Sequence, residues 1–281
     1  MYGLTARQTR AKMPRPRLNR SDPLVDDSLL FAAAYGWRRG YTDRAAGDFG
    51  DRDAQSAYRG FWTLGAGAGQ YGAGPQIGAQ AGWGCDNGDG VTGDSSQEWI
   101  PDPARWMDLP AQAATWAISI RPDVQSVNGQ LPFFKRRAQP YGAANAGWCF
   151  TGAAGNLWRF NYSNGAAQAT ATGTTVQDVT GIRTDFLIVT MAPSGANVVV
   201  TMYCNGLLEA QIATGTQLAN AAATEAVKIF GLGPANERFP GFSDVAYIWG
   251  RPLNEVEIKR LSADRFRPFR GGIRARQGMA W

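Results

Sequence analysis

The acids between Cys85 and Glu98 are the residues that most resemble a metal-binding set. Asp86, Asp89 and Asp94 lie there among glycines, and carboxylate oxygens are ligands that calcium prefers. Their spacing does not match the alternating D-x-D-x-D-G ligand pattern, however, and Asp and Gly are also the residues that make tight turns. We therefore expect turn chemistry here, keep these three acids as weak calcium candidates, and predict no other cofactor.

The sequence lacks the residue combinations that common hydrolases use for catalysis. It contains no histidine, which excludes Ser-His-Asp and Cys-His catalysis and most zinc hydrolase sites. Glycoside hydrolysis needs two flanking carboxylates, and the strand pattern Glu-x-Asp-x-x-Glu that would supply them does not occur. Glu255 and Glu257 are two residues apart, but they open a predicted helix, where acids complement the helix dipole. We predict a protein that is not an enzyme.

The three cysteines, Cys85, Cys149 and Cys204, are far apart in the chain and lie beside apolar or aromatic residues. An odd number at wide spacing fits neither a disulfide framework nor the close pairs of a zinc site. We therefore predict free, buried thiols, which are typical of a protein made in a reducing compartment.

Aromatic rings beside loops could stack on the rings of a sugar. Tyr71, Tyr141 and Trp148 are the candidates for such a carbohydrate site. Against this interpretation, ten tryptophans in a chain of 281 residues mostly fill a core. Binding of a host glycan therefore stays an alternative.

The two ends of the chain are basic. Residues 1–20 carry six bases and residues 265–281 carry five, with no acid in either segment, which leaves 17 bases against 23 acids in between. The basic residues predicted to bind a partner are Arg7, Arg10, Lys12, Arg15, Arg17, Arg20, Arg267, Arg270, Arg274 and Arg276.

These basic ends allow three interpretations. Clustered arginines could bind nucleic acid by releasing counterions, but residues 1–20 lack interleaved aromatics and the middle of the chain is acidic. The ends could also be solvated and without a role. We favour arms that pair with carboxylates of neighbouring proteins in an assembly, because Phe266, Phe269 and Trp281 favour docking against protein.

Several segments alternate between apolar and polar residues with period two, which predicts strands with one buried face. The clearest are Thr115–Arg121, Asn156–Tyr162 and Val198–Cys204. The last of these ends at Asn205-Gly206, the dipeptide that best suits a type I′ hairpin turn, and Leu207–Thr214 is the predicted return strand. Further strands are predicted at Leu29–Tyr35, Leu131–Lys135, Trp148–Thr151, Asp185–Met191, Val227–Gly231 and Phe242–Trp249.

One short helix is predicted after the last strand. Asn254 is its N-cap, and Glu257 completes a capping box. Leu253, Val256 and Leu261 are expected on its apolar side, with Ile258 at the margin of that side.

Three stretches resemble the concanavalin A-like lectin/glucanase superfamily, in its laminin-G-like branch. They are WAISIRP (Trp116–Pro122), VVTMYCNGLLEA (Val199–Ala210) and FPGFSDVAYIWGRPLNEVEIKRL (Phe239–Leu261). The resemblance implies an all-β protein, a two-sheet antiparallel jelly-roll sandwich with one short C-terminal helix and extended basic termini. The expected organisation is an N-terminal arm at 1–22, the sandwich at 23–269 and a C-terminal tail at 270–281.

Two further stretches, RPRLNRSDPL (Arg15–Leu24) and LSADRFRPFR (Leu261–Arg270), resemble laminin-G-like proteins of tailed phages and prophages. This resemblance implies a virion protein made in the host cytoplasm, a capsid decoration or fibre-like component that binds other capsid or tail proteins. We expect a homo-oligomer, with a trimer as the working expectation. The sequence contains no run of 18 apolar residues, so we predict no membrane span. The alternatives are a tail-fibre lectin and, less favoured, a glucan hydrolase.

Overall fold

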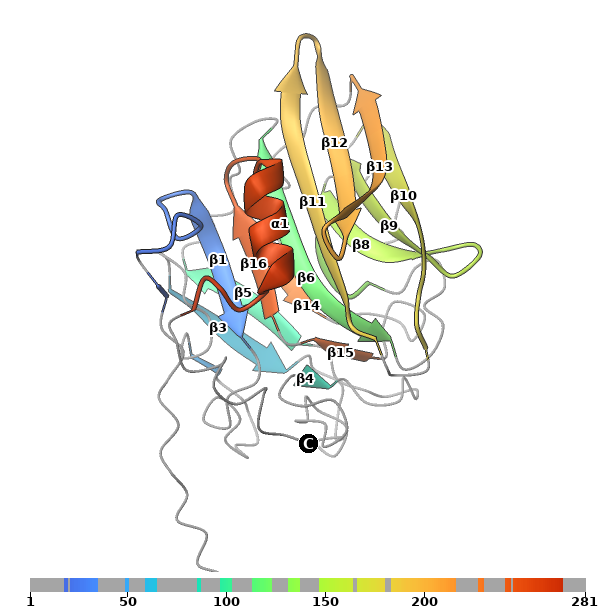
Figure 1. Cartoon of the computed structure of the whole chain (residues 1–281). Coiled ribbons are helices and arrows are strands. Elements are labelled where there is room, and N and C mark those ends of the chain that lie inside the picture. The colour runs from blue at the N-terminus through green and yellow to red at the C-terminus, as the bar shows by residue number, and fades with distance from the viewer. Residues whose placement is uncertain are drawn as a thin grey trace, which may run out of the picture.

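Strands make up most of the chain that the computed structural model describes. The described residues are 18–19, 21–34, 49–50, 59–64, 85–86, 97–102, 113–122, 131–136, 147–163, 166–179, 183–215, 227–229, 241–243 and 245–269. Within them the strands form two antiparallel sheets, and one helix, α1 (Glu255–Ala263), follows the last strand. Figure 1 shows the two layers, with α1 lying against the first sheet. The jelly-roll prediction is confirmed.

The first sheet has the strand order β1-β16-β6-β11-β12-β13, and its central strand β6 pairs with both β16 and β11. Two short strands, β15 and β4, extend from the end of β6. The strands are β1 (Leu29–Ala34), β4 (Cys85–Asp86), β6 (Ala114–Pro122), β11 (Asp185–Ser194), β12 (Asn197–Cys204), β13 (Leu207–Thr214), β15 (Gly241–Ser243) and β16 (Val245–Trp249).

The second sheet has the order β10-β9-β8-β7-β14-β5-β3-β2. Its strands are β2 (Phe49–Gly50), β3 (Arg59–Leu64), β5 (Gln97–Asp102), β7 (Phe133–Arg136), β8 (Gly147–Ala153), β9 (Leu157–Ser163), β10 (Gln168–Val176) and β14 (Val227–Ile229). Every predicted strand is found within about two residues at its N-terminal end. Strands β2, β3, β4, β5 and β10 were not predicted. The inner face of β10 is built from Ala169, Ala171 and Gly173, which carry little hydrophobic signal.

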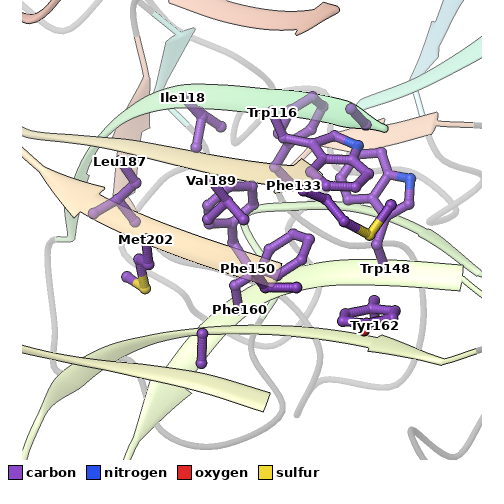
Figure 2. Packing of buried hydrophobic residues seen from close by; sticks show 14 of the residues in the cluster. Trp116, Ile118, Phe133, Trp148, Phe150, Phe160, Tyr162, Leu187, Val189 and Met202 are labelled. Atoms are coloured by element: carbon purple, nitrogen blue, oxygen red, sulfur yellow. The ribbon is translucent and has the colours of Figure 1, made fainter. Parts of the chain in front are cut away.

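Aromatic side chains fill the space between the two sheets (Figure 2). Trp116 of β6 lies with its ring centroid 5.0 Å from that of Phe160 on β9 and 5.5 Å from that of Trp148 on β8. Phe133 meets Trp148 edge-on at 4.9 Å, and Phe150 meets Phe160 at 5.0 Å. Tilted and edge-on pairs at these separations are the favourable geometries for aromatic rings.

The outer face of the first sheet is also buried, because α1 and the segment after it cover it. Ala117, Ile188 and Tyr247 of the sheet pack there against Ile258 and Leu261 of the helix. This second cluster explains why all but one of the residues of β6 are buried, whereas the period-two pattern predicted one polar, outward face. Among the described residues, no helix is long and apolar enough to cross a membrane.

The capping of α1 was predicted correctly, and its apolar side was predicted in part, because Leu253 and Leu261 are buried but Val256 is not. The Asn254 side chain accepts a hydrogen bond from the Glu257 N–H, and the Glu257 carboxylate accepts one from the Asn254 N–H. Ile258 and Leu261 are the buried helix residues, while Val256 is 57% exposed. The angle at which the helix crosses the sheet determines which of its residues are buried, and the periodicity of the sequence does not specify that angle.

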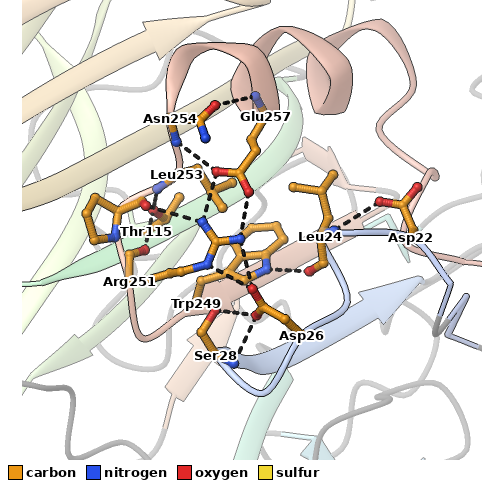
Figure 3. Close-up of polar contacts among 11 residues, drawn as sticks. Asp22, Leu24, Asp26, Ser28, Thr115, Trp249, Arg251, Leu253, Asn254 and Glu257 are labelled. Atoms are coloured by element: carbon orange, nitrogen blue, oxygen red, sulfur yellow. Dashed lines mark hydrogen bonds and ion pairs between the residues drawn. The ribbon is translucent and has the colours of Figure 1, made fainter.

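A polar network fixes the start of α1 to the N-terminal segment (Figure 3). Arg251 donates to both oxygens of Glu257, at 2.9 and 2.7 Å, and pairs with Asp26 at 2.9 Å. Hydrogen bonding to Glu257 raises the pKa of Arg251, and the same contact lowers the pKa of Glu257. Thr115 of β6 completes the network by donating to the Arg251 carbonyl and accepting from the Leu253 N–H.

The β12–β13 hairpin turns at Asn205-Gly206, as predicted. Both residues have positive φ, 53° and 84°, as a type I′ turn requires. A Cβ on Gly206 would lie 3.0 Å from the Ser262 Cβ, so the turn packs closely against the end of α1. A side chain at this position would therefore meet both backbone strain and a steric clash.

One carboxylate joins the free edges of the two sheets. Glu209 of β13 accepts hydrogen bonds from the backbone N–H groups of Thr174 and Thr175 on β10, at 2.6 and 2.8 Å, and from both threonine hydroxyls. Burial opposes ionisation of Glu209, but these hydrogen bonds outweigh it and lower the pKa below its ordinary value. The carboxylate thus pairs edge N–H groups that lie where the β9–β10 register is interrupted.

The corrected helix face gives a first prediction. Ile258→Ala removes buried methyl groups under α1 and should lower the free energy of unfolding by about 2–4 kcal/mol. Val256→Ala, a matched truncation on the exposed side of the same helix, should change it by less than about 0.5 kcal/mol. Urea unfolding of both variants checks this. Equal effects would show that the helix packs through the other face.

The Glu209 bridge predicts a pH-dependent loss of stability. Because its folded pKa is lowered, its contribution is present above the unfolded pKa of about 4.3 and is lost as pH falls through the folded value. Glu209→Gln should therefore destabilise the protein at pH 7 by about 1–2 kcal/mol and match the parent protein more closely near pH 3. Glu255→Gln, at an exposed carboxylate on α1, is the control in urea titrations at several pH values. A difference that does not vary with pH would contradict this role.

Candidate functional site

The N-terminal and C-terminal segments of the described chain meet on the outer face of the first sheet. Leu18 forms an antiparallel bridge with Phe269, and the Asn19 N–H donates to the Pro268 carbonyl at 2.7 Å. Asp22 is buried and lies 2.6 Å from the guanidinium of Arg267. We call residues 18, 19, 21, 22 and 266–269 the terminal junction. It holds the starting points of both predicted arms side by side.

Apolar packing makes the terminal junction part of the domain. Phe266 and Phe269 are 9% and 5% exposed, and Leu18 packs against the same cluster. The Phe269 ring lies 5.8 Å from that of Tyr247, whose hydroxyl donates to the Arg265 carbonyl. The expectation that Phe266 and Phe269 dock against another protein is therefore wrong, because both rings fill the domain's own second cluster.

The structure changes the predicted boundaries of the arms. Leu18, Asn19 and Asp22 were assigned to the extended arm, yet their backbone or side chains contact residues 267–269. Arg267, a predicted partner-binding residue, is engaged with Asp22 and belongs to the junction. The other predicted partner-binding residues, Arg7, Arg10, Lys12, Arg15, Arg17, Arg20, Arg270, Arg274 and Arg276, lie outside the described residues.

Of the three aromatic residues predicted to stack on a sugar, only Trp148 lies in the described part of the chain. Its interpretation as an exposed sugar-stacking ring is wrong. Its side chain is 3% exposed and packs between the sheets against Trp116 and Phe133. Trp148 was interpreted as a ring beside a loop, at the start of a predicted strand, but it shares the inward face of β8 with Phe150. Tyr71 and Tyr141 lie outside the described residues.

The weak calcium candidates remain a prediction. Asp89 and Asp94 lie outside the described residues, and Asp86 is described only as backbone in β4, opposite Phe242. Within the described part of the chain, no group of three or more Cys, Asp or Glu residues is placed to hold a metal ion.

The most buried acid of the described chain lies at the hairpin end of the sandwich. Asp185 of β11 is fully buried and accepts a hydrogen bond from the Trp158 indole N–H of the second sheet, at 2.8 Å. Arg183 donates to it at 2.7 Å and Asn205 at 3.2 Å. The hydrogen bond to Asp185 raises the pKa of Arg183. With both oxygens paired, this carboxylate has a structural role.

The cysteine prediction is confirmed for the two thiols that the structure describes. Cys149 and Cys204 are free and buried. Burial, assisted by the negative charges of Asp185 and Glu209, raises the pKa of Cys204 to about 12. Because a nucleophile must be the thiolate, a thiol with this pKa is inert at neutral pH.

The outer surface of the second sheet carries a set of polar residues that the sequence predictions missed. On β8, β9 and β10 the aromatic and small residues point into the core, so the alternate residues point outward. The register aligns these outward residues in rows across the three strands. We call this set the polar face: Cys149, Thr151, Arg159, Asn161, Ser163, Gln168, Thr170 and Thr172.

A signal for the polar face was present in the sequence. The period-two pattern of Asn156–Tyr162 already placed Arg159 and Asn161 opposite the aromatic residues, and they were taken as ordinary solvent-facing positions. Asn161 is in fact fully buried, whereas Arg159 is partly exposed. Alternation predicts the face of a residue but not what covers it.

Comparison with solved structures supports the sandwich. The binding domain of botulinum neurotoxin DC in complex with rat synaptotagmin II is similar, with a TM-score of 0.56 and 11% identity over 84% of this chain and 51% of that one. Botulinum neurotoxin type C, whose cell entry is dependent upon interaction with two ganglioside molecules, gives 0.55 and 13% over 84% and 51%. This chain therefore spans about half the length of these structures. The likeness is one of fold.

Comparison with curated proteins found no match. A family model, Laminin_G_3 of the concanavalin A-like lectin/glucanases superfamily, matches residues 92–259. That range includes most strands of both sheets, the β12–β13 hairpin and the start of the capped helix. It covers well over half of the sequence and agrees with the two-layer structure, and the chain therefore belongs to the concanavalin A-like lectin/glucanases superfamily.

Proposed function

We propose that this protein is a non-enzymatic adhesion component of a phage virion, held to capsid or tail proteins by its basic arms. The observation that carries the proposal is the terminal junction, where Leu18 and Phe269 lie side by side. Residues 1–17 carry five bases and residues 270–281 carry three, with no acid in either segment. Both cationic segments therefore attach to the domain at one place.

This arrangement favours anchoring. Once one arm pairs with carboxylates of a neighbouring protein, the other is held close to the same surface at a high effective concentration. The ion pair between Asp22 and Arg267 and the buried rings of Phe266 and Phe269 provide a firm base for both arms. Two weak electrostatic contacts then act as one stronger attachment.

The remaining polar groups support a role without turnover. The buried acid Asp185 is fully paired, the thiol of Cys204 is held protonated, and the polar face contains no carboxylate. Glycoside hydrolysis needs two carboxylates across a cleft. A glucan hydrolase is therefore the least supported of the three candidate functions.

A carbohydrate-binding receptor module, for instance on a tail fibre, is the second candidate. The polar face favours it, because amide, hydroxyl and guanidinium groups are the ones that pair with sugar hydroxyls. The two candidates differ in what they require: attachment to a particle depends on the arms, and glycan binding depends on the sandwich. We expect a homo-oligomer in either role, since sites on particles are symmetric.

The arms give a direct prediction. Changing the five bases of residues 1–17 to Gln should weaken retention on particles several-fold, and changing the three bases of residues 270–281 as well should abolish it. Retention should also fall as salt rises, because exposed ion pairs are screened. Particles lacking the protein are mixed with each purified variant, sedimented and assayed by immunoblotting and electron microscopy.

The matched control changes Lys259 and Arg260, two exposed bases on α1, to Gln. It removes charge from the folded domain and leaves the arms intact, so retention should be unchanged. Thermal unfolding should be the same for all variants, because the substituted arm residues precede or follow the terminal junction. Full retention of the variant without arm charges would refute anchoring by the arms.

A further inference from the structure

Two β-bulges face each other where the edges of the two sheets meet. On β13, the register with β12 skips Glu209, which lies between the paired residues Leu208 and Ala210. On β10, residues 173–175 lie opposite Trp158 alone in the register with β9. A bulge ends regular pairing and redirects the side chain that it contains. Both bulges lie where the Glu209 carboxylate binds β10, so both serve the same contact.

This contact brings β10 and β13 close together, at the same side of the sandwich (Figure 1). Gly173 is buried, and a Cβ on it would lie 3.2 Å from the Glu209 Oε2 and 3.4 Å from the Glu209 Cβ. No further strand fits between them here, because paired strands lie about 4.8 Å apart. We call Gly173, Thr174, Thr175 and Glu209 the edge contact.

Apart from Glu209, β13 has the properties of a strand that pairs with another chain. Among the described residues, no strand pairs with its outer edge. Its eight residues include no proline and no other charge, and Leu207 and Leu208 are 71% and 61% exposed. Unprotected edges of this kind add strands from other chains, and proteins prevent this with bulges and with charges that point inward. The edge contact contains both of these protective features.

We propose that the edge contact prevents a second copy of this chain from pairing with β13, and that opening it makes β13 an interface between copies. The partner is a second copy because an antiparallel strand can pair with itself about a two-fold axis, with the same surface on both sides. Without Glu209, β13 carries no charge, so self-pairing places no like charges opposite each other. The exposed Leu207 and Leu208 would also lose contact with water.

With Glu209 in place, the same pairing is unfavourable. An incoming strand would have to cover the carboxylate or displace it from the two N–H groups and two hydroxyls that it accepts from. A carboxylate that loses its hydrogen bonds without regaining water is strongly disfavoured. The edge contact therefore favours the closed edge over the paired one. This inference does not depend on the proposed attachment to a particle.

The test compares the full chain with its Glu209→Ala variant by sedimentation velocity over a series of protein concentrations. Any assembly made by the arms is common to both, so each mass is compared with that of the parent protein. We expect the parent mass to stay constant and the variant to at least double its mass as concentration rises. At low concentration, hydrogen exchange at the Thr174 and Thr175 amides should be at least about ten-fold faster in the variant.

A double variant separates strand pairing from general loss of stability. Gln211 is exposed on the same strand, and a lysine on an edge strand opposes pairing. Glu209→Ala with Gln211→Lys should therefore return to the parent mass while amide exchange at Thr174 and Thr175 stays fast. The matched control is Gln211→Ala, which removes only a side-chain contact to Thr201 and should keep the parent mass and exchange.

Gly173→Val opens the edge contact in a second way, because its side chain would separate β10 from β13 without removing a hydrogen-bonding group. The backbone at Gly173 is not in the left-handed region, so it accepts a side chain. This variant should gain mass as Glu209→Ala does, and it decides the question if Glu209→Ala does not fold. Folded variants that keep the parent mass, or association that Gln211→Lys does not suppress, would overturn the proposal.

Discussion

Aromatic contact between the two sheets is the interaction on which the rest of the structure depends. Trp116 in the centre of the first sheet packs against Trp148 and Phe160 of the second, and burial of such large rings dominates core energetics. These contacts direct the inward face of each strand, and they therefore fix which residues point outward. The apolar cluster under α1 and the polar face on β8–β10 are both consequences of this single division.

Packing the two sheets together also buries polar groups at the ends and edges of the strands, and specific side chains provide hydrogen-bond partners for these groups. Asp185 receives hydrogen bonds from Trp158 of the opposite sheet, and Glu209 pairs the edge N–H groups of β10. Each carboxylate therefore joins the two sheets, Asp185 at the end of a strand and Glu209 at the edge strands β13 and β10.

Local chemistry made individual strands, the hairpin turn and the helix cap predictable from sequence, while the two-sheet arrangement was predicted from the family resemblance. The turn at Asn205-Gly206 and the cap at Asn254 depend on residues close in the chain, and both were predicted correctly. Tertiary contacts decided the positions that were predicted wrongly. Trp148 opens a predicted strand and was taken as a loop-side ring, yet it faces the core, and Val256 faces solvent because of how α1 crosses the sheet. The pairing of Leu18 with Phe269 joins residues at opposite ends of the chain, and no local pattern encodes it.

The same division of faces gives the proposed roles a spatial basis. The terminal junction packs with the cluster under α1, on the outer side of the first sheet, while the polar face lies on the outer side of the second. The aromatic core, about 10 Å thick in packed sheets, separates them. An attachment made through the arms would therefore start on the side of the sandwich that lies away from β8–β10. A sandwich needs no conformational change to hold a particle on one side and a ligand on the other, since its rigid core already keeps the two surfaces apart.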